Sequence, residues 1–221
     1  MPLKDDLLQR TLDQLAEVVR SLASLQQAND FDEAEAVLQE AYRKHTGSEA
    51  ALFRRLPSEQ ILSVLSSAGV VDRDKSFLIA TLFKTEAALR EARGEDVQVG
   101  LQVKALDLYL EAALAELDTD ELPGNIAQLE QQLASYALPV ATQWRLFEYS
   151  RFLRRYDDAE DKLFDLLEQL GPTDEVTTRG RRFYTALLAT PPERLEAGGL
   201  PLAEVREGAT AFETALVAAS P

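Results

Sequence analysis

The 221-residue sequence contains no cysteine and only one histidine, His45. Without cysteine the chain can form no disulfide, no thiolate nucleophile and no cysteine-ligated zinc or iron–sulfur site. With a single histidine it cannot build a His-rich metal site, a zincin motif or the paired Glu-x-x-His motifs of a di-iron centre. We therefore expect no cofactor and no metal. The lack of cysteine also fits a reducing compartment.

Basic residues are scarce: 23 Lys and Arg stand against 38 Asp and Glu, and the net charge is -15. No Lys or Arg lies between Ala105 and Trp144. Such a charge repels nucleic acid and anionic lipid, so we expect neither a nucleic acid nor a membrane as partner. No apolar run has transmembrane length, and Met1–Leu25 is charged and amphipathic, unlike a signal peptide. These features predict a cytoplasmic location.

An aromatic residue, an acidic pair and an alanine recur in two distant stretches of the chain. They are Asn29-Asp30-Phe31-Asp32-Glu33-Ala34 and Arg154-Arg155-Tyr156-Asp157-Asp158-Ala159. In each stretch the aspartate after the aromatic residue, Asp32 or Asp157, is a candidate N-cap, and Glu35 or Glu160 is placed to close a capping box. Both stretches therefore predict a tight turn that opens the second helix of an antiparallel pair.

Helical apolar spacing between caps and breakers predicts an all-α chain. The predicted helices cover about 7–27, 32–44, 58–65, 73–93, 97–117, 125–136, 139–155, 157–170, 174–188 and 201 onward. Residues 51–56 are expected to form a connector, and 118–124, ending in Pro123-Gly124, an acidic loop. No stretch alternates with period two, so we expect essentially no sheet. The sequence predicts one domain over 1–221, an array of helical hairpins with N-terminal hairpins at about 1–117 and C-terminal hairpins at about 125–221.

The first helix carries a seam at heptad spacing, formed by Leu8, Leu12, Leu15, Val19 and Leu22. Such a seam packs against the second helix of the same chain, or it pairs with the same helix of a second subunit. A structural homodimer through this helix is therefore one alternative for the function.

Candidate catalytic residues are few. His45 follows Arg43-Lys44 at the end of a predicted helix, where a cation interacts favourably with the helix dipole. The acidic pair Asp157-Asp158 fits a helix cap better than a general acid and base. We therefore predict a protein that is not an enzyme. A small-molecule hydrolase or transferase that uses scattered carboxylates is the second alternative.

One predicted helix, 139–155, has apolar residues on both sides of its helical wheel. Leu146 and Tyr149 lie on one side, and the other side carries Trp144, Phe147, Arg151, Arg154 and Arg155. Tryptophan and arginine often dominate binding energy, so these five residues are the predicted partner-binding surface, with an acidic peptide as candidate ligand. The alternative is that the two aromatic rings pack inside the protein beneath the arginine stems.

Residues 29–41, and residues 156–170 together with Pro172, resemble the turn and second helix of a tetratricopeptide repeat. The whole chain, including Gly198-Gly199-Leu200-Pro201, resembles a bacterial domain-of-unknown-function family with degenerate tetratricopeptide-like hairpins. This resemblance implies a fold, a tetratricopeptide-like right-handed superhelix, and not an activity. From the predicted array of helical hairpins we expect a non-enzymatic protein–protein interaction or scaffold module of unknown pathway. The lysines and asparagines that clamp peptide carboxylates in chaperone-binding repeats are not matched, because Ala16, Val19 and Ala23 stand in those places.

Overall fold

The computed structural model describes residues 2–67 and 69–218, with side chains from Asp13 onward. Contacts divide the chain into two compact units, Met1–Leu138 and Pro139–Pro221, which we call unit 1 and unit 2. The described residues form twelve helices and one two-stranded hairpin, so the predicted all-α class is confirmed. Within this described part, no helix has both the length and the apolar character that crossing a membrane requires.

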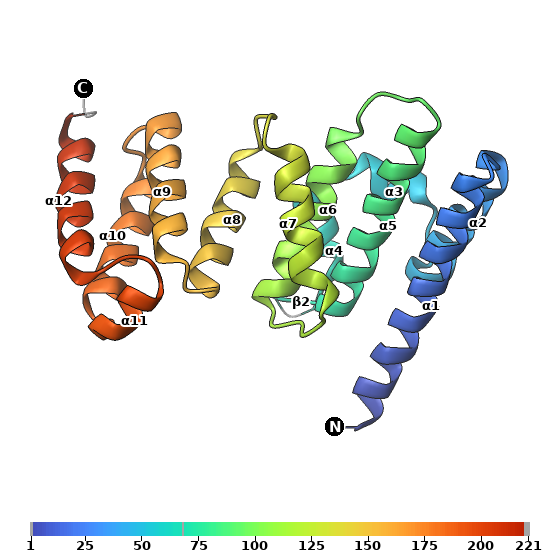
Figure 1. Cartoon of the computed structure of the whole chain (residues 1–221), viewed down its shortest axis with the longest axis horizontal. Helices are drawn as coiled ribbons and strands as arrows, with labels where there is room; N and C mark the ends of the chain where they lie inside the picture. Colours follow the sequence, from blue (N-terminus) through green and yellow to red (C-terminus); the bar gives the residue numbers. More distant parts are fainter. Residues whose placement is uncertain (1, 68, 219–221) are drawn as a thin grey trace. The chain divides into compact units, whose positions relative to one another are not determined.

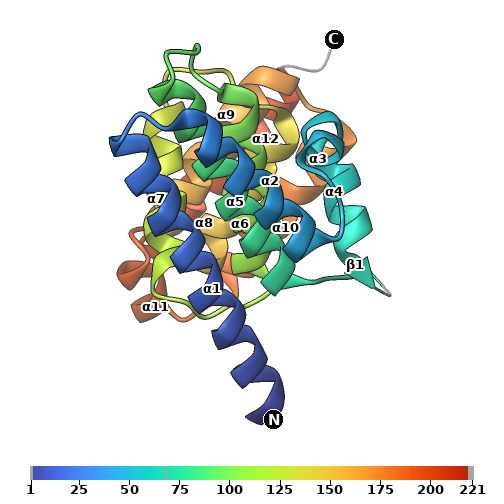
Figure 2. The same ribbon diagram turned by 90° about the vertical axis from the view of Figure 1, so that its right-hand side faces the viewer.

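Unit 1 is built around the long helix α5, which packs against α1, α2 and α6. Its elements are α1 (Pro2–Gln27), α2 (Phe31–Thr46), α3 (Ala50–Arg55), α4 (Ser58–Leu65), β1 (Ser66–Ser67), β2 (Val70–Val71), α5 (Arg73–Ala92), α6 (Val99–Leu114) and α7 (Glu121–Leu133). Helices α5 and α6 form an antiparallel pair (Figure 1), and the small β hairpin follows α4 (Figure 2). Helix α7 packs on α6. Helix α7 thus belongs to unit 1, which ends at Leu138.

Helix α5 is buried on more than one side, as its apolar sequence predicts. Phe77, Ile79, Leu82 and Phe83 are each at most 1% exposed. The helix begins after Asp72, whose side chain accepts a hydrogen bond from the Lys75 backbone N–H. Since residues on several faces are apolar, α5 can serve as the centre of unit 1 with other helices around it.

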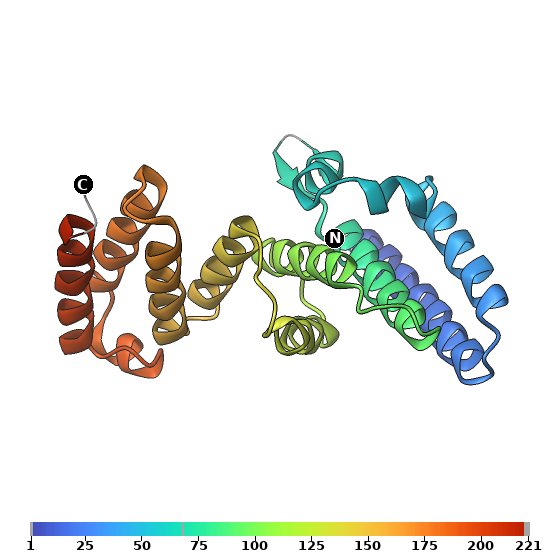
Figure 3. The same cartoon turned by 90° about the horizontal axis from the view of Figure 1, so that it is seen from above.

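Unit 2 is a set of helices around an aromatic core. Its elements are α8 (Val140–Phe152), α9 (Tyr156–Leu170), α10 (Asp174–Leu188), α11 (Pro192–Ala197) and α12 (Leu202–Ala218). Helix α9 packs against α8 and α10, and α10 packs against α12 (Figure 3). Gly180 permits the close approach of α12, because a Cβ at this position would overlap the Phe212 ring. Thr173 caps α10 by accepting a hydrogen bond from the Val176 backbone N–H.

The two recurring turns share an unusual backbone conformation. Asn29 has a φ of 56° and Arg154 a φ of 58°, both left-handed, and a helix begins two residues later in each case. The predicted caps Asp32 and Asp157 are wrong, because the helices start at the aromatic residue and both aspartates lie inside the first turn. The side chain that caps α2 is Asp30, which accepts a hydrogen bond from the Glu33 backbone N–H.

Two predicted loops contain helix. The segment expected as a connector forms α3, whose Phe53 side chain is buried at 4% exposure. Helix α7 begins at Glu121, so Pro123 and Gly124 lie in its first turn and do not precede it. A proline is tolerated there because the first backbone N–H groups of a helix have no partner within the helix.

The seam of the first helix is used within the chain where the structure describes it. Leu15 and Leu22 are 3% and 2% exposed, and α1 packs on α2 and α5. The side chains of Leu8 and Leu12 lie outside the described residues. At Leu15 and Leu22 the seam therefore belongs to the core of unit 1, as expected if the first helix packs within its own chain.

Candidate functional site

A half-open groove with a volume of about 930 Å³ lies in unit 1. Helix α1 contributes lining residues between Asp13 and Gln26, and α5 contributes residues between Phe77 and Leu89. Tyr109, the segment 118–121 and Asn125 complete the lining. Because all of these residues belong to unit 1, the groove is a feature of one packed body.

The wall formed by α1 combines small apolar side chains with three polar ones, Asp13, Arg20 and Gln26. Ala16, Val19 and Ala23 follow one another at helical spacing on the side of α1 that lines the groove. The neighbouring Leu15 and Leu22 reach into the core and hold the helix in place. This combination leaves space above the alanines while the helix itself is anchored.

The floor of the groove is aromatic and rigid. Phe77 and Tyr109 pack edge to face with ring centroids 5.4 Å apart. Thr81 donates a 2.9 Å hydrogen bond to the Phe77 carbonyl, so its hydroxyl accepts the 2.9 Å hydrogen bond from the Tyr109 hydroxyl. Burial raises the pKa of Tyr109. The tyrosine therefore stays neutral and its polar atom is already paired.

One end of the groove is polar and carries most of its charge. Lys84 donates a 2.7 Å hydrogen bond to Asn125 Oδ1, and burial lowers the pKa of this lysine while the charge of Glu121 offsets part of the change. Four carboxylates and two cations line the groove. They are Asp13, Asp118, Asp120, Glu121, Lys84 and Arg20. The lining therefore has an excess of negative charge at its rim and apolar side chains at its floor.

The groove offers surfaces for noncovalent binding. Its lining includes no histidine and no serine, and its two threonines on α5, Thr81 and Thr85, donate hydrogen bonds to helix carbonyls. Within the described part of the chain, no group of three or more His, Asp or Glu side chains is arranged to hold a metal ion. A concave site that combines apolar side chains with polar groups is typical of binding sites.

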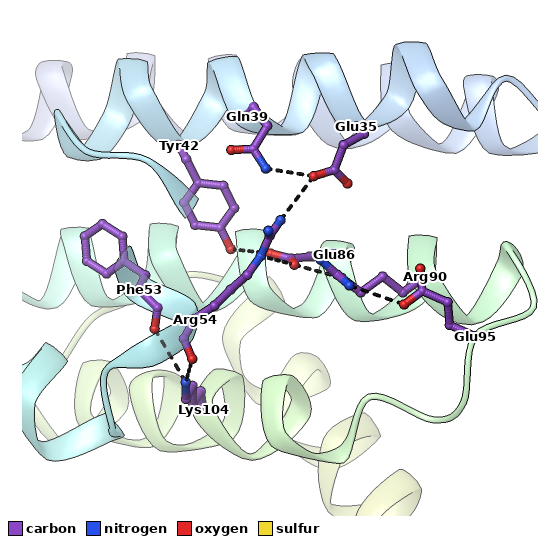
Figure 4. Close-up of polar contacts among 9 residues, drawn as sticks. All are labelled: Glu35, Gln39, Tyr42, Phe53, Arg54, Glu86, Arg90, Glu95 and Lys104. Atoms are coloured by element: carbon purple, nitrogen blue, oxygen red, sulfur yellow. Dashed lines mark hydrogen bonds and ion pairs between the residues drawn. The ribbon is translucent and has the colours of Figure 1, made fainter. Parts of the chain in front are cut away.

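A second polar cluster in unit 1 surrounds Glu86, which is 0% exposed (Figure 4). Its Oε1 forms ion pairs with Arg54 Nε at 2.5 Å and Arg90 Nε at 2.9 Å, and its Oε2 accepts a 3.1 Å hydrogen bond from the Tyr42 hydroxyl. Burial and the nearby Glu86 charge raise the pKa of Tyr42. A carboxylate that no solvent reaches cannot receive a ligand, so this cluster fixes α2, α3 and α5 to one another.

The outer part of the Glu86 cluster corrects a prediction about capping. Glu35 accepts hydrogen bonds from Gln39 at 2.7 Å and from Arg54 at 3.2 Å, and so does not close a capping box (Figure 4). Burial acts to raise the pKa of Glu35, but these hydrogen bonds outweigh it and the pKa lies below its usual range. Lys104 donates to the Arg54 carbonyl at 2.5 Å, at the end of α3.

Two of the five predicted partner-binding residues lie in the core of unit 2. Trp144 is 5% exposed and Phe147 is 0% exposed, and their rings meet edge to face at 5.5 Å. Phe147 also packs edge to face on Phe183 of α10. Among the described residues, Trp144 Nε1 has no hydrogen-bond acceptor. These two rings contribute packing to unit 2 and present almost no surface to a ligand.

Arg151, the third predicted residue, covers the aromatic core. Its guanidinium lies 5.4 Å from the Phe147 ring centroid and 6.0 Å from that of Phe183, and it donates a 2.6 Å hydrogen bond to Glu148. Arg179 of α10 lies 4.5 Å from the Trp144 ring centroid and 3.7 Å from the same glutamate. Glu148 therefore occupies the position between two arginines that an acidic ligand would otherwise take.

The remaining two predicted residues, Arg154 and Arg155, are exposed at the turn after α8. Arg155 pairs with Asp158 at 3.1 Å across the first turn of α9. Arg154 holds the left-handed backbone conformation of that turn. The structure thus places the three arginines at the surface and the two aromatic rings beneath it, and a recognition role for the five residues stays a prediction.

Sequence reasoning did not assemble the groove of unit 1, although its parts were visible. The alanines and valine of α1, the acidic segment 118–121 and the lack of basic residues between Lys104 and Arg145 are all plain in the sequence. Their lining positions come from elements separated by more than fifty residues. Only packing could show that they face one another.

Comparison with protein families matches residues 70–216 to the family described as "Family of unknown function (DUF6483)". The match covers α5, α6 and α7, which form one side of the groove, and all the helices of unit 2. The α1 wall, residues 13–26, lies outside it. Searches of curated proteins and of solved structures found no match. Since the family match spans well over half of the 221 residues, the chain belongs to this family of unknown function.

Proposed function

We propose that this chain is a non-enzymatic binding protein that holds a segment of another protein in the groove of unit 1. The observation that carries the proposal is the groove itself, about 930 Å³ of half-open space between anchored helices. Its apolar walls and charged rim favour binding over chemistry. The resemblance to tetratricopeptide hairpins supports the same role and a right-handed superhelical arrangement of hairpins.

The dimensions of the groove favour a chain segment over a small metabolite. The α1 wall runs from Asp13 to Gln26, and the α5 wall from Phe77 to Leu89. At 1.5 Å per residue each wall is about 18–20 Å long. Peptide segments of three to four helical turns have this length. A cytoplasmic location belongs to the same proposal and is supported by the lack of cysteine.

The arginine surface of unit 2 is the weaker candidate for binding a partner. Its aromatic members, Trp144 and Phe147, are committed to the core, and Glu148 already pairs with Arg151 and Arg179. A ligand would have to displace this internal carboxylate. The groove requires no such exchange, and we therefore place the binding function there.

The test compares two tryptophan substitutions one residue apart on α1. Ala23→Trp fills the groove, whereas Ser24→Trp adds the same side chain at an exposed position that does not line it. Each variant and the parent are immobilised, and native extract is passed over them. We expect a partner captured by the parent and Ser24→Trp and lost by at least about tenfold with Ala23→Trp, since a bulky ring excludes the ligand. Equal capture by both variants would show that the groove is not the binding surface.

A further inference from the structure

We propose that the segment held in the groove is a basic amphipathic helix, with an apolar stripe facing the groove and Lys or Arg along its edges. This inference rests on the proposed function of the groove and specifies the chemistry of the partner. Three features of unit 1 carry it: the small apolar wall of α1, the paired polar atoms of the floor, and the excess of carboxylates at the rim.

The walls of the groove favour an occupant whose backbone is satisfied internally. Ala16, Val19 and Ala23 offer no side-chain donors or acceptors, and the Tyr109 and Thr81 hydroxyls at the floor already bond to each other. Against this part of the lining, an extended peptide would lose backbone hydrogen bonds to water without replacing them. A helix keeps its own hydrogen bonds, and its apolar residues at i, i+3 or i+4, and i+7 match the length of the α1 wall.

Small residues on both walls permit a helix to approach closely. Ala16 and Ala23 lie seven residues apart on α1, and Ala88 lies on the facing α5. Leucine or isoleucine side chains of a partner fit between such alanines, as larger side chains fill the grooves beside smaller ones where helices pack. The apolar face of the partner would then cover Phe77 and Leu89 at the floor.

The charge around the groove favours a cationic partner. Residues 1–138, which form unit 1, contain 13 Lys and Arg against 24 Asp and Glu. At the rim, the exposed Asp118, Asp120 and Glu121 lie on the side of α7, and Asp13 lies on α1. Lysines or arginines on the edge of a bound helix that faces the segment 118–121 would therefore meet carboxylates. A second copy of this chain, at net charge -15, would bring like charge to this rim.

Two cations, Lys84 and Arg20, also line the groove, against four carboxylates. Lys84 is bonded to Asn125 and lies close enough to Glu121 for that carboxylate to act on its pKa. An anionic ligand that approached Lys84 would also meet the carboxylates of 118–121. The charge pattern therefore opposes an acidic peptide or a fatty acid in the groove.

The first experiment uses three labelled peptides of eighteen residues with the full chain and measures fluorescence anisotropy. The basic probe has leucine and alanine at i, i+3, i+4 and i+7 and lysine elsewhere. The second has the same composition in an order that spreads the leucines around the helix. The third has glutamate in place of every lysine. We expect the basic probe to bind about tenfold more tightly than the other two, because only it offers both the stripe and the charge.

Variants then locate the site and its charge. Ala23→Trp should weaken binding of the basic probe about tenfold, with Ser24→Trp as the matched control. Asp118→Asn with Asp120→Asn should weaken it about threefold to tenfold and flatten its salt dependence, since two rim charges are removed. The control is Glu49→Gln with Asp96→Asn, which removes two charges at exposed positions outside the groove.

The outcomes separate this inference from the proposed function. Equal binding of the two lysine peptides, tighter binding of the glutamate peptide, or equal loss from both charge variants overturns the basic helix. If Ala23→Trp still abolishes capture of a native partner in that case, the groove binds a protein segment of other chemistry. If the basic probe binds the parent tightly only at concentrations where light scattering shows a dimer, the binding site needs a second copy of the chain. The proposal of a groove within a single chain is then overturned.

Discussion

Tyr184 of α10 donates a 2.7 Å hydrogen bond to Glu160 of α9, and the two side chains meet against Gly208 of α12. A Cβ at this glycine would overlap the Glu160 carboxylate. Burial raises the pKa of Glu160, and the bond from Tyr184 opposes part of that rise. One carboxylate thus links three helices of unit 2, where the sequence had suggested a capping role.

Replacing either of two glycines in unit 2, Gly180 or Gly208, by alanine should lower stability, for a different reason in each case. In Gly180→Ala the new methyl group meets the Phe212 ring, so we expect unfolding to become easier by about 1–3 kcal/mol. In Gly208→Ala the methyl group meets the end of a flexible glutamate, so the expected loss is about one hydrogen bond, roughly 0.5–1.5 kcal/mol. Denaturant unfolding followed by the fluorescence of Trp144, the only tryptophan, reports on unit 2.

The control for these variants is Gly100→Ala, where an added Cβ meets nothing within 4 Å in helix α6. Alanine has the higher helix propensity, so this change should leave stability unaltered or raise it by up to about 1 kcal/mol. Circular dichroism follows this variant because Gly100 lies in unit 1. A larger loss for Gly100→Ala than for Gly180→Ala would contradict the packing described for α10 and α12.

The buried ion pairs of Glu86 should be costly to break. Glu86→Gln leaves Arg54 and Arg90 with no full counter-charge on that side, and we expect a loss of about 3–5 kcal/mol. Tyr42→Phe removes one hydrogen bond to a charged group and should cost about 1.5–3 kcal/mol. Urea denaturation followed by circular dichroism measures both. A loss under about 1 kcal/mol for Glu86→Gln would show that the cluster is not sealed from water.

Two arginines of the predicted partner-binding surface, Arg151 and Arg155, should contribute unequally to stability. Arg151→Ala uncovers the rings of Phe147 and Phe183, and we expect a loss of about 1 kcal/mol. Arg155→Ala breaks only an exposed pair with Asp158 and should change stability by less than about 0.5 kcal/mol. Thermal and urea unfolding compare the two. Equal effects would mean that Arg151 does not pack on the rings.

His45 offers a direct test of burial, because it is the only histidine. Burial lowers its pKa, and the charge of Lys44 lowers it further. The imidazole is therefore less basic than an ordinary histidine, and Arg43 and Lys44 supply cations in the last turn of α2. Nuclear magnetic resonance should give a midpoint below the ordinary value of about 6.5, and Lys44→Gln should move it upward. A midpoint above 6.5 would contradict the burial.

The lowered pKa of His45 also predicts how the stability of the protein changes with pH. The folded state of His45 binds protons less readily than the unfolded state, so its contribution is fully present above the unfolded pKa near 6.5. It is lost as pH falls from there through the folded pKa. The parent should therefore lose more stability than His45→Gln over this window. An equal loss in both proteins would assign the acid dependence to other groups.

Local chemistry in the sequence was sufficient for most of the secondary structure. Thr173 caps α10, and Gly47 ends α2 in a left-handed conformation, because these residue types satisfy helix ends wherever they occur. The caps at Asp32 and Asp157 failed since an aromatic residue can begin a helix once the residue two positions earlier has turned the chain. The left-handed Asn29 and Arg154 make that turn.

What the sequence by itself determined is the set of amphipathic helices and the excess of acid, because periodicity and charge are properties of neighbouring residues. Tertiary structure alone decided which faces are covered. Trp144 and Phe147 share a helix face that could have been exposed, and their burial depends on Phe183 from α10. The groove likewise needs Ala16 and Lys84 from different helices. Burial and proximity arise only when distant segments pack, and no local pattern contains them.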